Sequence, residues 1–123
     1  MLADDEEVVR IVAAEALTSV GYEVEVAEDG RRAVELFDRF EAQWGVVILD
    51  LIMPHLNGNR VFEHIHARRP DLPVVLASGF SAEEITERFE GRPVAAFLHK
   101  PYTCETLVEL VSGVLGSQSL DVS

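Results

Sequence analysis

The sequence predicts an α/β fold in which helices cover both faces of a parallel β-sheet, and two observations support this prediction. Segments with a helical spacing of apolar residues alternate with short apolar runs along the whole chain. Two of these runs, residues 46–49 and 74–77, are apolar without interruption, which is typical of strands buried on both faces of a parallel sheet. We therefore expect one doubly wound domain.

The first half of the chain supplies three strands and two helices. Residues 1–3 form the first strand, and residues 6–20 carry an apolar stripe at helical spacing. Residues 22–27 alternate apolar and acidic side chains, which indicates a half-exposed strand. A second helix begins at about residue 31, and the buried strand at 46–49 follows it.

The second half continues the alternation. We expect a helix from about residue 59, the buried strand at 74–77, a short helix from Ser81, a strand at 94–98 and a last helix from Cys104. The flavodoxin-like strand order 2-1-3-4-5 places the half-exposed strand at an edge and the apolar strands in the middle. This five-stranded order is our prediction.

The two ends of the chain are less regular. Three residues precede Asp4, fewer than in an ordinary strand, so the first strand is either a stub or has been trimmed. This slightly favours a domain cut from a longer protein. We assign residues 1–116 to the domain and expect residues 117–123, which have no pattern, to be a disordered tail.

Composition excludes several classes of function. The 123 residues include 10 Lys and Arg against 22 Asp and Glu, a formal net charge of −12 that argues against direct binding to nucleic acid or to anionic lipid. The lone cysteine cannot form an internal disulfide. The chain lacks an apolar run of the roughly 20 residues that a membrane-spanning helix needs, and its start lacks the basic residues of a signal peptide. We expect a cytoplasmic protein.

Polar residues follow four of the predicted strands. Asp4 and Asp5 follow the first strand and Asp50 follows the third, while Ser78 follows the fourth and Lys100 the fifth. Alone, each has a simpler explanation, because acidic residues often cap helices and lone polar residues often lie in turns. Together they fall on the sheet edge where open parallel sheets bind ligands. Clustered carboxylates also require a neutralising cation, and Mg²⁺ prefers oxygen ligands.

Four short motifs occur in order at these strand ends. They are Asp4-Asp5, residues 50–58 (DLIMPHLNG), Ser78-Gly79 and Lys100-Pro101. In this combination the chain resembles, over nearly its whole length, a response-regulator receiver domain of bacterial two-component signalling. The resemblance implies a signalling module, not a metabolic enzyme. Such a module takes a phosphoryl group from a sensor histidine kinase or a phosphotransfer protein.

The resemblance also implies a role for each site residue. Asp50 would be the phosphoacceptor, and a carboxylate can accept a phosphoryl group covalently. Asp4 and Asp5, with Asp50 and the backbone carbonyl of Ile52, would hold Mg²⁺. Lys100 would contact the phosphoryl group as a compact positive charge.

The resemblance implies that two further residues would change position on phosphorylation and act as a conformational switch. Ser78 matches a Ser or Thr position of the family, and Phe97 matches the position of its switching aromatic residue. The fourth helix and fifth strand, residues 81–100, would be the surface that partners read. The resemblance also implies a cis peptide bond before Pro101.

Other interpretations remain open. A flavin-binding flavodoxin shares the fold class, but residues 4–7 (DDEE) would repel a flavin phosphate. An aspartyl phosphatase commonly has an acid two residues after its nucleophile, where this chain has Ile52. The chain could also be a degenerate receiver that binds partners without phosphorylation. It could also be a free-standing regulator, or a receiver cut from a longer hybrid histidine kinase or regulator. The sequence does not name the kinase, the stimulus or the output.

Overall fold

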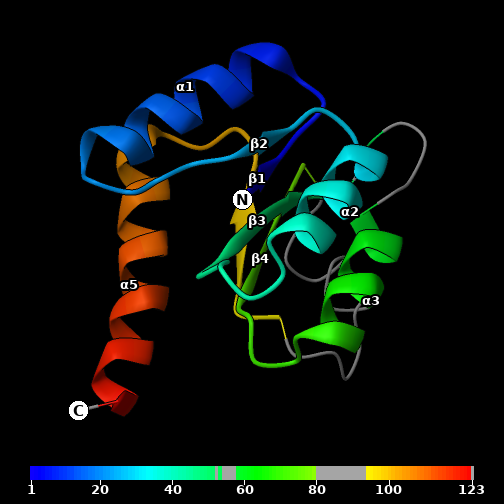
Figure 1. Ribbon diagram of the computed structural model, residues 1–123. Helices are drawn as coiled ribbons and strands as arrows, with labels where there is room; N and C mark the ends of the chain where they lie inside the picture. Colours follow the sequence, from blue (N-terminus) through cyan, green and yellow to red (C-terminus); the bar gives the residue numbers. More distant parts are fainter. Residues whose placement is uncertain (52, 54–57, 80–93, 123) are drawn as a thin grey trace.

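The computed structural model describes residues 1–51, 53, 58–79 and 94–122, with side chains up to residue 115. Five strands form one parallel sheet in the order β2-β1-β3-β4-β5, which confirms the predicted order (Figure 1). The strands are β1 (Leu2–Ala3), β2 (Val26–Ala27), β3 (Val47–Asp50), β4 (Val74–Ser78) and β5 (Ala96–His99). The helices of the described residues are α1 (Glu7–Ser19), α2 (Gly30–Arg39), α3 (Gly58–Arg68) and α5 (Cys104–Val122).

The sheet separates two apolar cores. One core packs α2 and α3 against one face of the sheet, with Phe37 and Phe62 as its largest fully buried side chains. The other core packs α1 and α5 against the opposite face, with Leu17 and Leu107 in contact with the strands. Figure 1 shows these two helix pairs on either side of the strands. All residues of β3 and β4 are buried, as their unbroken apolar runs predicted.

The edge strand is shorter than the sequence predicted. The alternation over residues 22–27 indicated one continuous strand, but β2 contains only Val26 and Ala27. Its neighbour limits it, because the register pairs Leu2 with Val26 and Ala3 with Ala27, and β1 supplies no further residues. A strand forms only where a neighbouring strand offers hydrogen bonds.

In the second half of the chain, α5 begins at Cys104, as the sequence predicted. The structure carries α5 on to Val122, into the stretch where we expected a disordered tail. Main-chain hydrogen bonds can extend a helix without apolar periodicity. The short helix expected from Ser81 lies outside the described residues.

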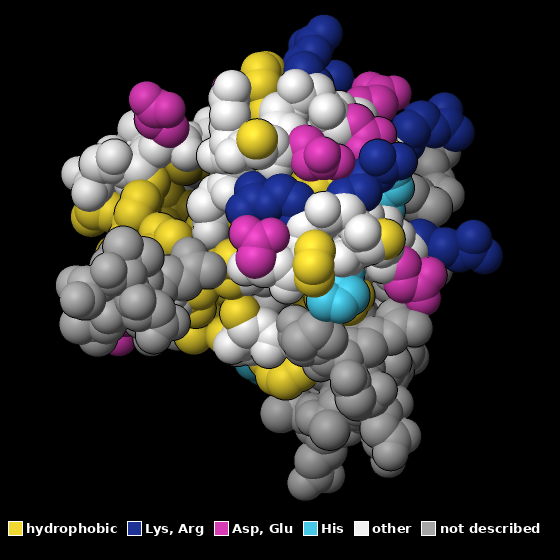
Figure 2. Space-filling model, turned by 60° about the horizontal axis from the view of Figure 1, so that its bottom comes forward, with side chains coloured by type: hydrophobic (Ala, Val, Ile, Leu, Met, Phe, Trp, Pro, Cys, Tyr) yellow, Lys and Arg dark blue, Asp and Glu magenta, His cyan; other side chains and the backbone are white. Residues whose placement is uncertain are grey.

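A cavity of about 260 Å³ lies at the amino ends of the strands, next to the short β1. Tyr22, Trp44 and Leu115 are among its lining residues. Figure 2 brings this lower side of the molecule forward and shows apolar side chains beside a hollow. The Met1 amino group donates a hydrogen bond to the Val46 carbonyl over 3.0 Å, and burial lowers the pKa of this amine to about 5.

No helix within the described part of the chain has both the length and the apolar character needed to span a bilayer.

Candidate functional site

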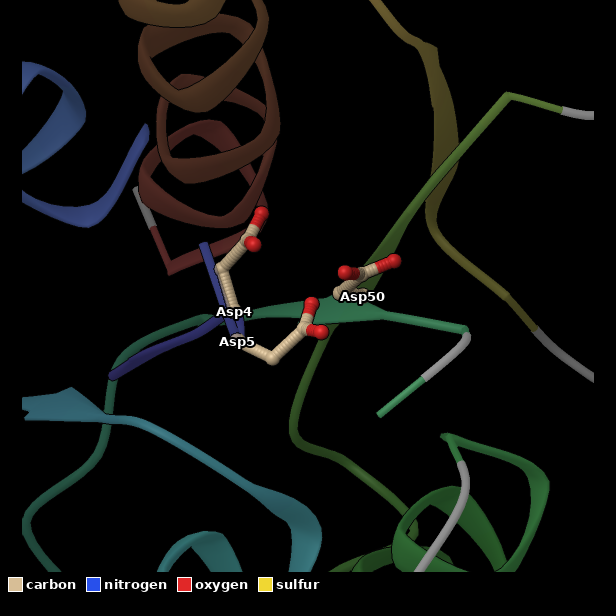
Figure 3. Close-up of side chains that lie close together, drawn as sticks. All are labelled: Asp4, Asp5 and Asp50. Carbon is tan, nitrogen blue, oxygen red and sulfur yellow. The ribbon is translucent and has the colours of Figure 1, made fainter. Parts of the chain in front are cut away.

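Three carboxylates meet at the carboxyl edge of the sheet. Asp4 and Asp5 follow β1, and Asp50 is the last residue of β3, which lies beside β1. One carboxylate oxygen from each lies within 4.8 Å of the others. Figure 3 shows the three side chains gathered where the segment after β1 passes the end of β3. The structure thus brings together three side chains that the sequence separates by up to 46 positions (50 − 4).

The two inner carboxylates are buried, whereas the third is exposed. Asp4 and Asp50 are 1% and 5% exposed, and Asp5 faces solvent. The backbone N–H of Glu6 donates to Asp4 Oδ1 over 2.9 Å, and Arg10 Nη1 donates to the Asp4 carbonyl oxygen over 2.8 Å. These bonds fix the turn between β1 and α1, so that it presents Asp4 inward and Asp5 outward.

Lys100 supplies the positive charge of the site. Its Nζ lies 2.8 Å from Asp4 Oδ2, 3.1 Å from Asp50 Oδ2 and 3.4 Å from Glu6 Oε1. Burial by itself would lower the pKa of Lys100, but its hydrogen bonds with Asp4 and Asp50 and the charges of these two carboxylates outweigh this effect and raise the pKa above its ordinary value. The ammonium group therefore stays charged and neutralises part of the cluster.

Main-chain hydrogen bonds and a close main-chain contact hold Lys100 and Asp50 in position. The Lys100 N–H donates to the Ser78 carbonyl over 2.8 Å, which extends the pairing of β4 with β5 by one bond. The Lys100–Pro101 peptide bond is cis. On the other side, the Gly58 N–H donates to the Leu51 carbonyl over 2.9 Å, and an added Cβ at Gly58 would lie 2.7 Å from the Asp50 carbonyl oxygen.

The two residues expected to act as a switch lie on neighbouring strands. Ser78 is buried at the end of β4, beside the cluster, and Phe97 in β5 is 37% exposed. The register pairs Leu76 with Phe97 and Ser78 with His99. Because side chains two residues apart in a strand share a face, Ser78 and Phe97 project from the same face of the sheet. Ile52 and most of residues 81–100 lie outside the described residues.

Sequence reasoning missed two residues of this site. Glu6 contacts Lys100, and nothing in its sequence context distinguishes it from a residue that caps the following helix. Tyr102 has a buried hydroxyl without a hydrogen-bond partner among the described residues. Burial, followed by the charge of Asp4, raises the pKa of Tyr102 to about 12, so the hydroxyl stays protonated. A single aromatic residue after a proline carries no signal for such a position.

The donor set of the cluster suits a hard divalent cation. All three side chains offer carboxylate oxygens, which are the ligands that Mg²⁺ prefers, and the exposed Asp5 leaves one side open to water. Asp4 already accepts hydrogen bonds on both oxygens, one from the backbone and one from Lys100. Of the two aspartates after β1, the exposed Asp5 is therefore the stronger candidate for a direct metal ligand.

Comparison with known proteins gives a consistent result. The family model described as "Response regulator receiver domain" matches residues 1–112. Response regulator MprA of Mycolicibacterium vanbaalenii is 33% identical over 94% of this chain and 49% of its own length. Sensor kinase CckA of Brucella abortus is 27% identical over 96% of this chain and 12% of its own length. This chain therefore spans about half or less of these two relatives.

Solved structures show the same fold. The receiver domain of NtrX from Brucella abortus superposes with a TM-score of 0.83 at 26% identity, covering 94% of this chain and 97% of that one. Chemotaxis protein CheY4 of Vibrio cholerae superposes with a TM-score of 0.82 at 26% identity, covering 92% and 94% of the two chains.

Proposed function

This chain belongs to the response regulator receiver domain family, and from that premise we propose that it accepts a phosphoryl group on Asp50 in the presence of Mg²⁺. The observation that carries the proposal is the setting of Asp50. Its carboxylate is buried at the end of β3, lies 3.1 Å from the Lys100 ammonium and sits within 4.8 Å of two further carboxylates. A cation and a covalent acceptor beside a candidate metal site are the parts that phosphoryl transfer needs.

Each residue has a role in the proposed transfer. An Asp50 carboxylate oxygen attacks phosphorus, and the bond to the donor breaks. Lys100 is close enough to Asp50 to donate a hydrogen bond to a phosphoryl oxygen as negative charge moves there. Asp5 and Asp50, with Asp4 behind them, would hold Mg²⁺. When bound, this ion would supply charge neutralisation on the phosphoryl oxygens.

We propose that the output is a change of surface. Aspartyl phosphate adds about two negative charges at the end of β3. The Ser78 hydroxyl, buried next to the cluster, would turn towards a phosphoryl oxygen and vacate space on its face of the sheet. Phe97, on the same face and 37% exposed, would then turn inward and change the surface around β5.

The proposed donors are a phosphohistidine of a sensor kinase or of a phosphotransfer protein. The relatives named above include a sensor kinase and a response regulator, which supports a place in such a relay. The protein would catalyse its own phosphorylation and dephosphorylation and no metabolic reaction.

The proposal is tested with acetyl phosphate as donor. We expect the intact protein to gain the mass of one phosphoryl group with Mg²⁺ present and to gain none when EDTA removes the ion. Asp5→Asn should raise the Mg²⁺ concentration for half-maximal rate by about tenfold or more. Glu7→Gln, two residues away in the first turn of α1, is the matched control and should leave that concentration unchanged. Phosphorylation that proceeds equally in EDTA would contradict the metal role.

A further inference from the structure

A cavity of about 650 Å³ opens beside the proposed phosphorylation site. Asp5, Glu6, Asp50 and Lys100 line its polar end. From there it extends between α1 and the segment that joins β5 to α5. Its other side, here called the apolar wall, consists of Val8, Val9, Val12, Pro101, Tyr102 and Cys104.

The apolar wall includes two well-exposed valines of α1. Val12 is 45% exposed, and Val8 is exposed further, although both lie within two turns of the acidic segment that starts α1. Apolar side chains that gather in a hollow next to polar groups are typical of ligand sites. The cavity volume also falls within the range of roughly 300–1,000 Å³ found for small-molecule pockets.

The position of the wall indicates which part of a ligand it would meet. In phosphoryl transfer the attacking and leaving oxygens lie roughly in line through phosphorus. With Asp50 as the attacking group, the leaving group extends away from the end of β3. Asp50 and the apolar wall line the same cavity, so a leaving group that extends from Asp50 into this cavity would meet the wall.

We propose that the apolar wall selects small phosphoryl donors whose acyl group is apolar, such as an aromatic acyl phosphate. This inference rests on the proposed function. In the reaction, a bond forms between an Asp50 oxygen and phosphorus, and the bond between phosphorus and the acyl oxygen breaks. The acyl group leaves as a carboxylate that carries the bonding electron pair, and no proton or redox partner is required. The apolar part of the donor binds against Val12 and its neighbours.

The test compares benzoyl phosphate with acetyl phosphate. The rate of phosphorylation is measured by intact mass with both donors and Mg²⁺, and the ratio of the two rates is compared between proteins. Val12→Ser should lower the benzoyl-to-acetyl ratio roughly fivefold, since it removes apolar surface from contact with the ring. Ile11→Ser is the matched control, because Ile11 is 50% exposed on the same helix and does not line the cavity. It should leave the ratio at the wild-type value.

The outcomes separate the inference from the function on which it rests. A ratio that is equal in the wild-type protein and both variants, or that rises in Val12→Ser, would overturn the selectivity while leaving Asp50 as the acceptor. In that case the wall would serve another ligand, such as a protein donor. Absence of phosphorylation with both donors would overturn the proposed function and the inference together.

Discussion

Replacement of Lys100 by alanine is expected to slow phosphorylation of Asp50 by roughly 100-fold or more. Its ammonium group lies 2.8 Å from Asp4 and 3.1 Å from Asp50, and both carboxylates are buried. Without Lys100, the negative charge that develops on the phosphoryl oxygens loses a nearby cation. The rate with acetyl phosphate and Mg²⁺, followed by intact mass, measures this effect.

The same replacement should also destabilise the fold when no metal is present. Removing one partner of a fully buried ion pair typically costs about 3–5 kcal/mol, and because the Lys100 side chain is 15% exposed, this range is the upper bound of the expected loss. Urea unfolding in EDTA measures the loss, and added Mg²⁺ should restore part of it. Asp50→Asn in the Lys100→Ala background removes one negative charge from the carboxylate cluster, so the double variant should be more stable than Lys100→Ala alone. A Lys100→Ala protein as stable as the wild type in EDTA would show that the ion pairs contribute nothing.

Replacement of Gly58 by alanine should lower the free energy of unfolding by about 1–3 kcal/mol. The added Cβ would lie 2.7 Å from both the Asp50 carbonyl oxygen and the Leu51 Cα. Both atoms belong to the main chain, so β3 or the start of α3 must shift. Because the contact involves Asp50 itself, we also expect slower phosphorylation.

Gly113→Ala provides the matched control for this prediction. Gly113 lies inside α5, and an added Cβ there would meet no heavy atom within 4 Å. An exposed glycine in a helix is less favourable than alanine by about 0.5–1 kcal/mol, so this variant should be more stable than the wild type. Urea denaturation gives both values. A Gly58→Ala protein that gains stability as Gly113→Ala does would contradict the close approach of α3 to Asp50.

The order of the strands could be predicted from the sequence because strands buried on both faces can be recognised by their uninterrupted apolar residues. A strand between two neighbours and two helix layers must be apolar throughout, as residues 47–49 and 74–77 are. The length of the edge strand could not be predicted in the same way. Alternation over residues 22–27 indicates which side chains face solvent. Strand pairing depends instead on β1, whose first paired residue, Leu2, lies beside Val26.

For the candidate site, the sequence predicts which residues converge but not the contacts that they make. Five residues lie at or just after the ends of strands, and parallel strands end at one edge, so their convergence follows from topology. They are Asp4, Asp5, Asp50, Ser78 and Lys100. The contacts within the site do not follow from topology. Glu6 reaches Lys100 through a side-chain conformation, and the Tyr102 hydroxyl is buried by the packing of the segment after β5. Such contacts depend on distances of a few ångströms between distant segments, and sequence patterns do not record them.

The central claim is that Asp50 is the phosphoacceptor, and the intact mass of Asp50→Asn tests it most directly. Wild-type protein and the variant are incubated with acetyl phosphate and Mg²⁺, together with Asp71→Asn, which changes an exposed carboxylate paired with Arg69. We expect the wild type and Asp71→Asn to gain the mass of one phosphoryl group and Asp50→Asn to gain none. No gain in the wild type, or an equal gain in Asp50→Asn, would contradict the claim.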